Sequence, residues 1–139
     1  MVVMNHELRS LLASDALGHL VTINADGSPQ VSVVWLGLEG NEIVIGHLGQ
    51  GHKISNIERD PRVSLTIESK NVNEIGLRSY AIIHGSARIE FGGAPELLQR
   101  LADIYIGEGV KFPPMDQPPS GHIIRITPAH IGGVGPWRE

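Results

Sequence analysis

The sequence predicts a mainly β domain with small helices, in which six antiparallel strands form a barrel. Three observations lead there: short apolar or alternating runs recur along the chain, tight-turn residues separate the first of these runs, and strands do not alternate regularly with helices. Closure of the sheet, or near closure, is the economical way to protect the edges of six antiparallel strands. The 139 residues fit one domain spanning residues 1–139.

The first half of the chain should contain a short helix and three strands. Leucines on one side of the first segment indicate the helix, and β-branched or alternating runs indicate the strands. Asp26-Gly27 and Gly40-Asn41 are tight-turn signals between successive strands. Such short connections predict an antiparallel meander of the three strands. The expected bounds are 7–12 for the helix and 20–23, 30–38 and 42–47 for the strands.

The second half should contain a short helix, three strands and a longer helix. Lys53 opens the short helix, and Asp60-Pro61 ends it. Gly85 inside a long strand is typical of a bend, a bulge or a close backbone approach. Four prolines exclude regular structure before the last strand, in a segment long enough for a lid or a dimer arm. The expected bounds are a helix at 53–59, strands at 63–68, 80–91 and 122–127, a loop at 70–77, a helix at 95–105 and an irregular segment at 111–120.

Composition narrows the classes of function. The net charge of −4 argues against broad nucleic-acid binding, which needs a basic surface. The absence of cysteine excludes disulfides and thiolate chemistry. No apolar run approaches the ~20 residues that span a membrane, and the N-terminus lacks a signal-peptide pattern, so we expect a cytoplasmic protein with no membrane partner. The seven histidines lack the spacing of a helical metal site, and no metal is expected.

The most informative segment leads from a glycine-rich turn into the short helix. Backbone N–H groups at a helix start attract anions, and Lys53 adds a positive charge there. Asn56 lies three residues later on the same side, and Gly51 precedes the lysine, so both are candidate hydrogen-bond partners of a phosphate group. The alternative is an exposed lysine beside a solvated asparagine. Neither a dinucleotide fingerprint nor a P-loop fits, because Ile54 stands where the first needs glycine and no Gly-Lys-Ser/Thr follows.

Four histidines have different expected roles. His47 and His52 flank the glycine-rich turn and should line a polar pocket. His84 and His122 are interpreted as ordinary strand residues. A Ser-His-Asp hydrolase is disfavoured, because Gly-x-Ser-x-Gly is absent and no serine falls on a sharp strand-to-helix turn.

The two tryptophans also differ. Trp35 lies on an alternating strand, so core packing is its simplest role. Trp137 lies two residues from the end of the sequence, and we expect it to contact a partner subunit or a ligand rather than its own core. No side chain stands out as a general acid, so the catalytic residues are unassigned.

Two segments resemble a known family. Residues 25–35 (ADGSPQVSVVW) are similar to the first hairpin of the pyridoxamine-phosphate-oxidase-like split β-barrels, and residues 53–65 (KISNIERDPRVSL) are similar to their Lys-x-x-Asn-Leu-x-x-Asp-Pro-Arg-Val segment. The tail at 126–137 resembles the B group of flavin/deazaflavin-dependent oxidoreductases. The resemblance extends over nearly the whole chain. It implies a six-stranded split barrel that forms a homodimer, with a flavin-type cofactor in a groove between the subunits.

The resemblance also implies a reaction and a site. The cofactor would be the deazaflavin coenzyme F-420, with flavin mononucleotide (FMN) as the alternative, and a hydride would pass to a small unsaturated or conjugated organic substrate. A protein that carries or senses the cofactor without turnover is the rival function. Relatives often place arginine just before the anchoring lysine, where this chain has Gly51-His52, so the positive charge is reduced unless a histidine is protonated. The residues implied to bind the cofactor are Gln30, Ser32, Val33, Val34, Trp35, Ile45, Gly46, His47, Gly51, His52, Lys53 and Asn56, with Trp137 as a contact to the partner subunit or the substrate.

Overall fold

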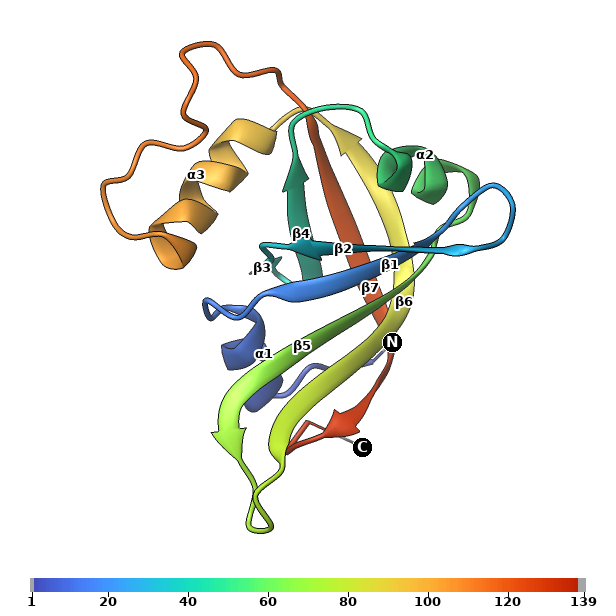
Figure 1. Cartoon of the computed structure of the whole chain (residues 1–139), viewed down its shortest axis with the longest axis vertical. Coiled ribbons are helices and arrows are strands. Elements are labelled where there is room, and N and C mark those ends of the chain that lie inside the picture. Colours follow the sequence, from blue (N-terminus) through green and yellow to red (C-terminus); the bar gives the residue numbers. More distant parts are fainter. Residues whose placement is uncertain (1, 138–139) are drawn as a thin grey trace.

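The computed structural model describes residues 2–137 and consists of one antiparallel sheet with three small helices (Figure 1). The strands are hydrogen-bonded in the order β2-β1-β5-β6-β7-β4-β3. The elements in chain order are α1 (His6–Leu12), β1 (Gly18–Ile23), β2 (Pro29–Val34), β3 (Gly37–Glu39), β4 (Glu42–His47), α2 (His52–Arg59), β5 (Arg62–Val72), β6 (Arg78–Phe91), α3 (Ala94–Tyr105) and β7 (His122–Val134).

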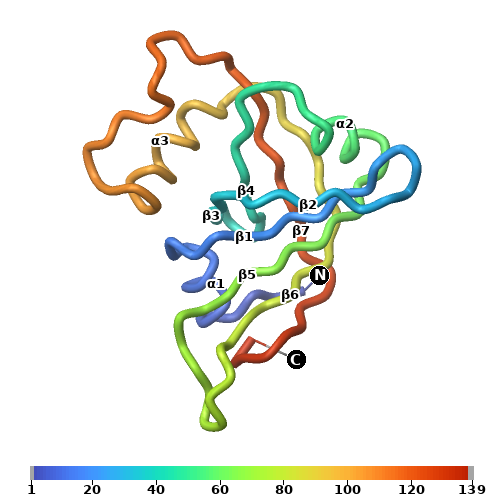
Figure 2. The backbone as a smooth tube through the Cα atoms, viewed as in Figure 1, coloured from blue at the N-terminus to red at the C-terminus, as the bar shows by residue number. Residues whose placement is uncertain are grey.

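The sheet curls around the main hydrophobic core, and the helices lie at its margins. The backbone trace in Figure 2 shows α2 beside the tip of the β1–β2 hairpin, α3 beside β4, and α1 below β1, near the end of β7. Buried aliphatic side chains from α1, α2 and six of the strands fill the core. A smaller cluster of Val44, Leu97, Leu101 and Ile123 joins α3 to the outer face of β4 and β7. α2 is therefore held at one end of the sheet through its buried Ile54 and Ile57.

The mainly β prediction is confirmed, but the sheet has seven strands where six were predicted, and over residues 2–137 it does not close. Its two edges, β2 and β3, do not pair with each other in the described residues. The segment expected to be one strand at 30–38 breaks at Trp35-Leu36 into β2 and β3. The hydroxyl of Tyr105 accepts from the N–H of Leu36 at 3.1 Å, and its one hydrogen faces the carbonyls of Ala16 at 2.8 Å and Leu36 at 3.2 Å. A side chain thus replaces the strand ladder at the break.

The predicted meander is confirmed at its two turns but not along its middle strand. β1 and β2 pair as expected, with Val21 opposite Val31, and the Gly40-Asn41 turn joins β3 to β4, with Leu38 opposite Ile43. β4 then pairs with β7 and not with β2. The break after β2 turns the chain away, so β2 becomes an edge strand. Turn signals identify where strands end, but they do not fix which distant strand a segment will join.

The other elements form at the predicted places, with two strands longer than expected. The three helices form where expected, and the proline-rich residues 111–120 are irregular. β5 and β7 are longer than predicted, reaching Val72 and Val134, so the expected loop at 70–77 shrinks to the turn between β5 and β6. The pairing of β6 with β7 is irregular at Gly85, where an added Cβ would collide with the carbonyl of Thr127. The predicted bulge or close approach at Gly85 is confirmed.

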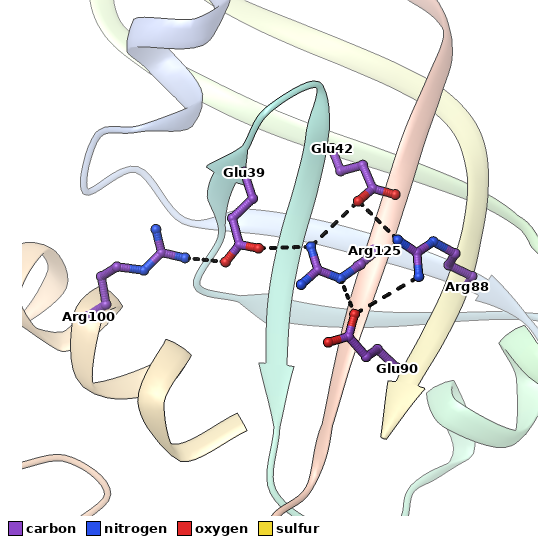
Figure 3. A network of polar contacts seen from close by, with 6 residues as sticks. All are labelled: Glu39, Glu42, Arg88, Glu90, Arg100 and Arg125. Atoms are coloured by element: carbon purple, nitrogen blue, oxygen red, sulfur yellow. Dashed lines mark hydrogen bonds and ion pairs between the residues drawn. The ribbon is translucent and has the colours of Figure 1, made fainter. Parts of the chain in front are cut away.

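An ion-pair network around Arg125 ties the sheet to α3 (Figure 3). The Arg125 guanidinium, largely buried, donates to Glu90 at 2.6 Å and Glu39 at 2.8 Å and lies 3.5 Å from Glu42. Arg88 pairs with Glu42, and Arg100 of α3 pairs with Glu39. These contacts hold the pKa of Glu90 below its usual value and raise that of Arg125. The network joins β3, β4, β6, β7 and α3.

Within residues 2–137, the structure has no helix long and apolar enough to cross a membrane.

Candidate functional site

The start of α2 presents an uncapped helix N-terminus. The chain leaves β4 at His47 and enters α2 through Gly51, the N-cap residue. Gly51 has an extended backbone and, being glycine, no side chain that could cap the helix. Within residues 2–137, the backbone N–H groups of His52 and Lys53 have no hydrogen-bond acceptor, and the first turn holds no acidic residue. Unpaired N–H groups at the positive end of a helix dipole are an anion-binding arrangement.

Lys53 is half-buried beside these amides. Burial lowers the pKa of its ammonium group, because water solvates the charge less well there. None of the described carboxylates lies within ion-pair distance of it. A half-buried ammonium without a counter-charge gains from an anionic guest, which would restore its pKa and satisfy its hydrogen-bond donors.

His47 lies directly behind the N-cap residue. Its Nε2 atom is buried and has no hydrogen-bond partner within the described residues. A Cβ atom added at Gly51 would lie 3.0 Å from Nε2, so the absence of a side chain at Gly51 permits this contact. Burial, then the positive charge of Lys53, lowers the pKa of His47, although the backbone of Gln50 partly opposes this. The ring is therefore held toward its neutral form.

Asn56 joins α2 to the β1–β2 hairpin. Its side chain is only 4% exposed. The amide nitrogen lies 3.0 Å from Thr22 Oγ1, 2.9 Å from Asn24 Oδ1 and 3.0 Å from Gln30 Oε1. The amide oxygen accepts from Arg59 at 2.9 Å. These contacts within the chain use the polar atoms of Asn56, so their evident effect is to fix the position of α2, and direct contact with a phosphate stays a prediction.

The other predicted site residues separate into two groups. Gln30 reaches the α2 site through its bond to Asn56, and His52 lies exposed in the first turn of α2. Ser32 and Val33 lie on the edge strand β2, where Val33 is 58% exposed.

The remaining members of the predicted set lie away from the start of α2 in this chain. Val34 and Ile45 belong to the main core, and Gly46 faces Leu98 of α3. Trp35 stacks on Tyr105 with 5.3 Å between ring centroids and contacts Phe112 of the proline-rich segment at 5.0 Å. The packing role expected for Trp35 is confirmed.

Trp137 corrects one sequence expectation. It is 6% exposed and belongs to the main core of its own chain, and its indole N–H donates to the carbonyl of Tyr80 at 3.0 Å. The expectation that a tryptophan so near the end would not reach its own core is wrong, because β7 continues along β6 to Val134 and carries the tail back to the sheet.

Two clefts differ in size and chemistry. The larger, about 720 Å³, lies between α1, the end of β5 and the segment after β7, away from Lys53. The smaller, about 570 Å³, lies against α2 and the β1–β2 turn. The smaller cleft adjoins the uncapped helix start, so chemistry rather than volume favours α2 as the candidate site. Its lining residues are Asn24, Ala25, Asp26, His52, Ser55, Asn56 and Arg59.

Sequence reasoning missed several residues around α2. Arg59 lies three residues after Asn56 and donates both to it and to the carbonyl of Ile23, a spacing that was visible in the sequence. Thr22 gave no signal, because its role depends on the packing of α2 against β1. His122 was interpreted as an ordinary strand residue, yet it lies opposite His47 in the register of β4 and β7 and is buried.

Comparison with known proteins identifies relatives of this fold. The family model for pyridoxamine 5'-phosphate oxidase matches residues 4–135. An F420 reductase structure is 26% identical with a TM-score of 0.71, and the match covers 94% of this chain and 98% of that one. A conserved hypothetical protein from Mycobacterium tuberculosis is 24% identical with a TM-score of 0.71, over 95% and 85% of the two chains. General Stress Protein 26 from Bacillus anthracis is 20% identical with a TM-score of 0.64, over 90% and 88%. No curated protein sequence matches the chain.

Proposed function

The chain belongs to the pyridoxamine 5'-phosphate oxidase family, and from this membership we propose that it is an oxidoreductase that uses the deazaflavin coenzyme F-420. The similarity to an F420 reductase over nearly the full length of both chains favours this cofactor over FMN. FMN is the alternative, since both cofactors carry a phosphate and a flat ring system. A small unsaturated or conjugated organic molecule is the proposed hydride acceptor.

One observation carries the proposal: among residues 2–137, the amides at the start of α2 and the half-buried Lys53 have no partner and are open to an anion. Lys53 and the N–H groups of His52 and Lys53 would hold the cofactor phosphate, and Gly51 leaves room for it. Asn56 keeps the helix in place beneath that contact. The bound cofactor supplies the hydride chemistry, and the chain positions it and shields it from water.

We propose that two copies of the chain form the complete site. The edge strand β2 exposes Val31 at 61% and Val33 at 58%, an apolar surface that a second copy would cover. Val34, Trp35, Ile45 and Gly46 pack inside their own subunit, so in this proposal they shape the groove from behind. Sedimentation should find a dimer at micromolar concentration. A monomer that binds the cofactor with unchanged affinity on dilution would contradict the shared site.

Replacement of Lys53 tests the phosphate contact. A charge-assisted hydrogen bond contributes about 1.5–3 kcal/mol, so Lys53→Ala should weaken binding of F-420 or FMN roughly 10- to 150-fold. Fluorescence titration with each cofactor measures the change. Lys70→Ala is the matched control, because Lys70 is exposed and lies on β5, where it pairs with Asp15. Equal dissociation constants for Lys53→Ala and the control would place the phosphate elsewhere.

Turnover separates an enzyme from a carrier. Protein loaded with reduced F-420 is mixed anaerobically with quinones, enones and tetrapyrroles, and reoxidation is followed by absorbance. An oxidoreductase should reoxidise the cofactor faster with at least one acceptor than a protein-free mixture does. Tight binding with no such acceleration favours the carrier or sensor, with the Lys53 result unaffected.

A further inference from the structure

Two histidines are cross-strand partners behind the start of α2. His47 ends β4 and His122 begins β7, and the two residues are direct partners in the antiparallel register. Opposite residues in such a pair project from the same face of the sheet. His122 is 8% exposed, and its Nδ1 atom, like Nε2 of His47, is buried with no hydrogen-bond partner within the described residues. Buried polar atoms are nearly always paired, so two orphans on adjacent rings are unusual.

The surroundings of His47 disfavour a proton on its ring. The charged or titratable groups that act on His47 are Lys53 from α2 and His122 from β7. β6 contributes the ring of Phe91, which meets His122 edge-on at 5.5 Å. Within residues 2–137, no carboxylate hydrogen-bonds to either histidine ring. A proton on His47 is therefore opposed by burial and by a neighbouring ammonium group, and among residues 2–137 only the backbone of Gln50 partly offsets them.

An anion at the start of α2 would reverse this balance. It would neutralise Lys53 and bring negative charge to the outer side of Gly51, whose inner side rests on the His47 ring. An opposite charge at short range favours the protonated imidazole. Gly51 has no side chain to separate the ring from the helix start, so the interaction acts over a short distance.

We propose that His47 and His122 form a proton-accepting pair that completes the anion site, so that an anion at the start of α2 binds together with a proton from solvent. The proposal rests on the proposed function for the identity of the natural anion, a cofactor phosphate. His47 receives the proton, and the orphan nitrogen of His122 tunes how readily it does so. The pair gives the site a second positive charge only when an anion is present.

Proton uptake makes affinity depend on pH with a defined sign. The bound anion raises the pKa of His47 above its value in the free protein. The additional affinity is complete below the free-state pKa and is lost as pH rises through the bound-state pKa. Between the two values the dissociation constant should increase up to about tenfold per pH unit.

Nitrogen NMR of the histidine rings tests the pair directly. Sulfate is the first probe, because it stays dianionic wherever histidine titrates, and FMN and F-420 follow. Each bound ligand should raise the pKa of His47, and Nε2 of His47 should take up the proton. The ring signals of His130, an exposed residue on β7, serve as the control and should not respond to the ligand. Unchanged titration of both His47 and His122 with a ligand bound would overturn the proposal.

Variants and ligands separate this inference from the proposed function. His47→Gln should flatten the pH dependence of binding, His122→Gln should shift it, and His130→Gln should leave it as in the wild type. If sulfate raises the His47 pKa but neither cofactor binds, the proton-accepting pair stands and the proposed function fails. If a cofactor binds without changing either titration, the proposed function stands and the pair fails. If no ligand binds, the proposed function and the proton-accepting pair both fail. If a variant does not fold, the NMR titration of the wild-type protein still tests the pair.

Discussion

Replacing Asn56 with alanine should destabilise the protein by about 3 kcal/mol. The amide has two hydrogens, so its three close acceptors, Thr22, Asn24 and Gln30, represent about two full hydrogen bonds at about 1 kcal/mol each. The bond from the Arg59 guanidinium to the amide oxygen adds roughly 1 kcal/mol, kept low because arginine is exposed here. Alanine also leaves the buried hydroxyl of Thr22 without this donor.

Thermal and urea unfolding measure this loss. For a chain of this size, 3 kcal/mol should lower the melting temperature by about 10 °C. The matched control is Ser55→Ala, one residue earlier on α2 and exposed, which should stay within about 0.5 kcal/mol of the wild type. If Asn56→Ala unfolds at the same urea concentration as Ser55→Ala, the Asn56 amide does not stabilise the packing of α2 against the hairpin, and the roughly 3 kcal/mol expected from its contacts is refuted.

Two further predictions concern ion pairs. Arg125→Met should cost about 2–3 kcal/mol of stability (Figure 3). The cost is lower than for breaking a fully buried ion pair, because Glu39, Glu42 and Glu90 keep partial access to water. An unchanged urea midpoint would contradict this prediction. Arg62 holds the pKa of Asp60 at about 2 instead of 3.8, so this pair stabilises the fold above pH 3.8 and its contribution is lost as pH falls toward 2. Asp60→Asn should therefore be less stable than the wild type at neutral pH but not near pH 2, as measured by urea unfolding at each pH. If the difference in stability between the two proteins is the same at both pH values, the prediction is wrong.

Local signals predicted most elements because the forces that define them act within a few residues. Helix starts, the Asp26-Gly27 turn and the bulge at Gly85 all depend on backbone preferences that a short segment carries by itself. The break at Leu36 does not. It depends on the hydroxyl of Tyr105, which is nearly half the chain away in sequence, and the apolar run from Val33 to Leu36 gives no local sign of a break.

The candidate site also contains local features, which the sequence predicts, and features that depend on tertiary packing, which it does not. The N-cap Gly51 and Lys53 were identifiable because a helix start and its nearest charges are local features. Asn56 was found for its position, but its contacts with Thr22 and Gln30 could not be inferred, since they require the hairpin to fold against α2. The prediction for Trp137 was wrong for a related reason, because the burial of its side chain depends on how far β7 follows β6.

Strand register therefore controls the charge of the proposed anion site. His47 and His122 become neighbours only because β7 pairs with β4, and a shift of one residue would turn one ring to the opposite face of the sheet. Burial then holds His47 toward its neutral form, with Lys53 reinforcing the effect. An arginine at the same place would keep its charge whether or not an anion were bound. Histidines placed by register instead make the second charge conditional on the ligand, so the fold, and not residue type alone, determines when the site is fully positive.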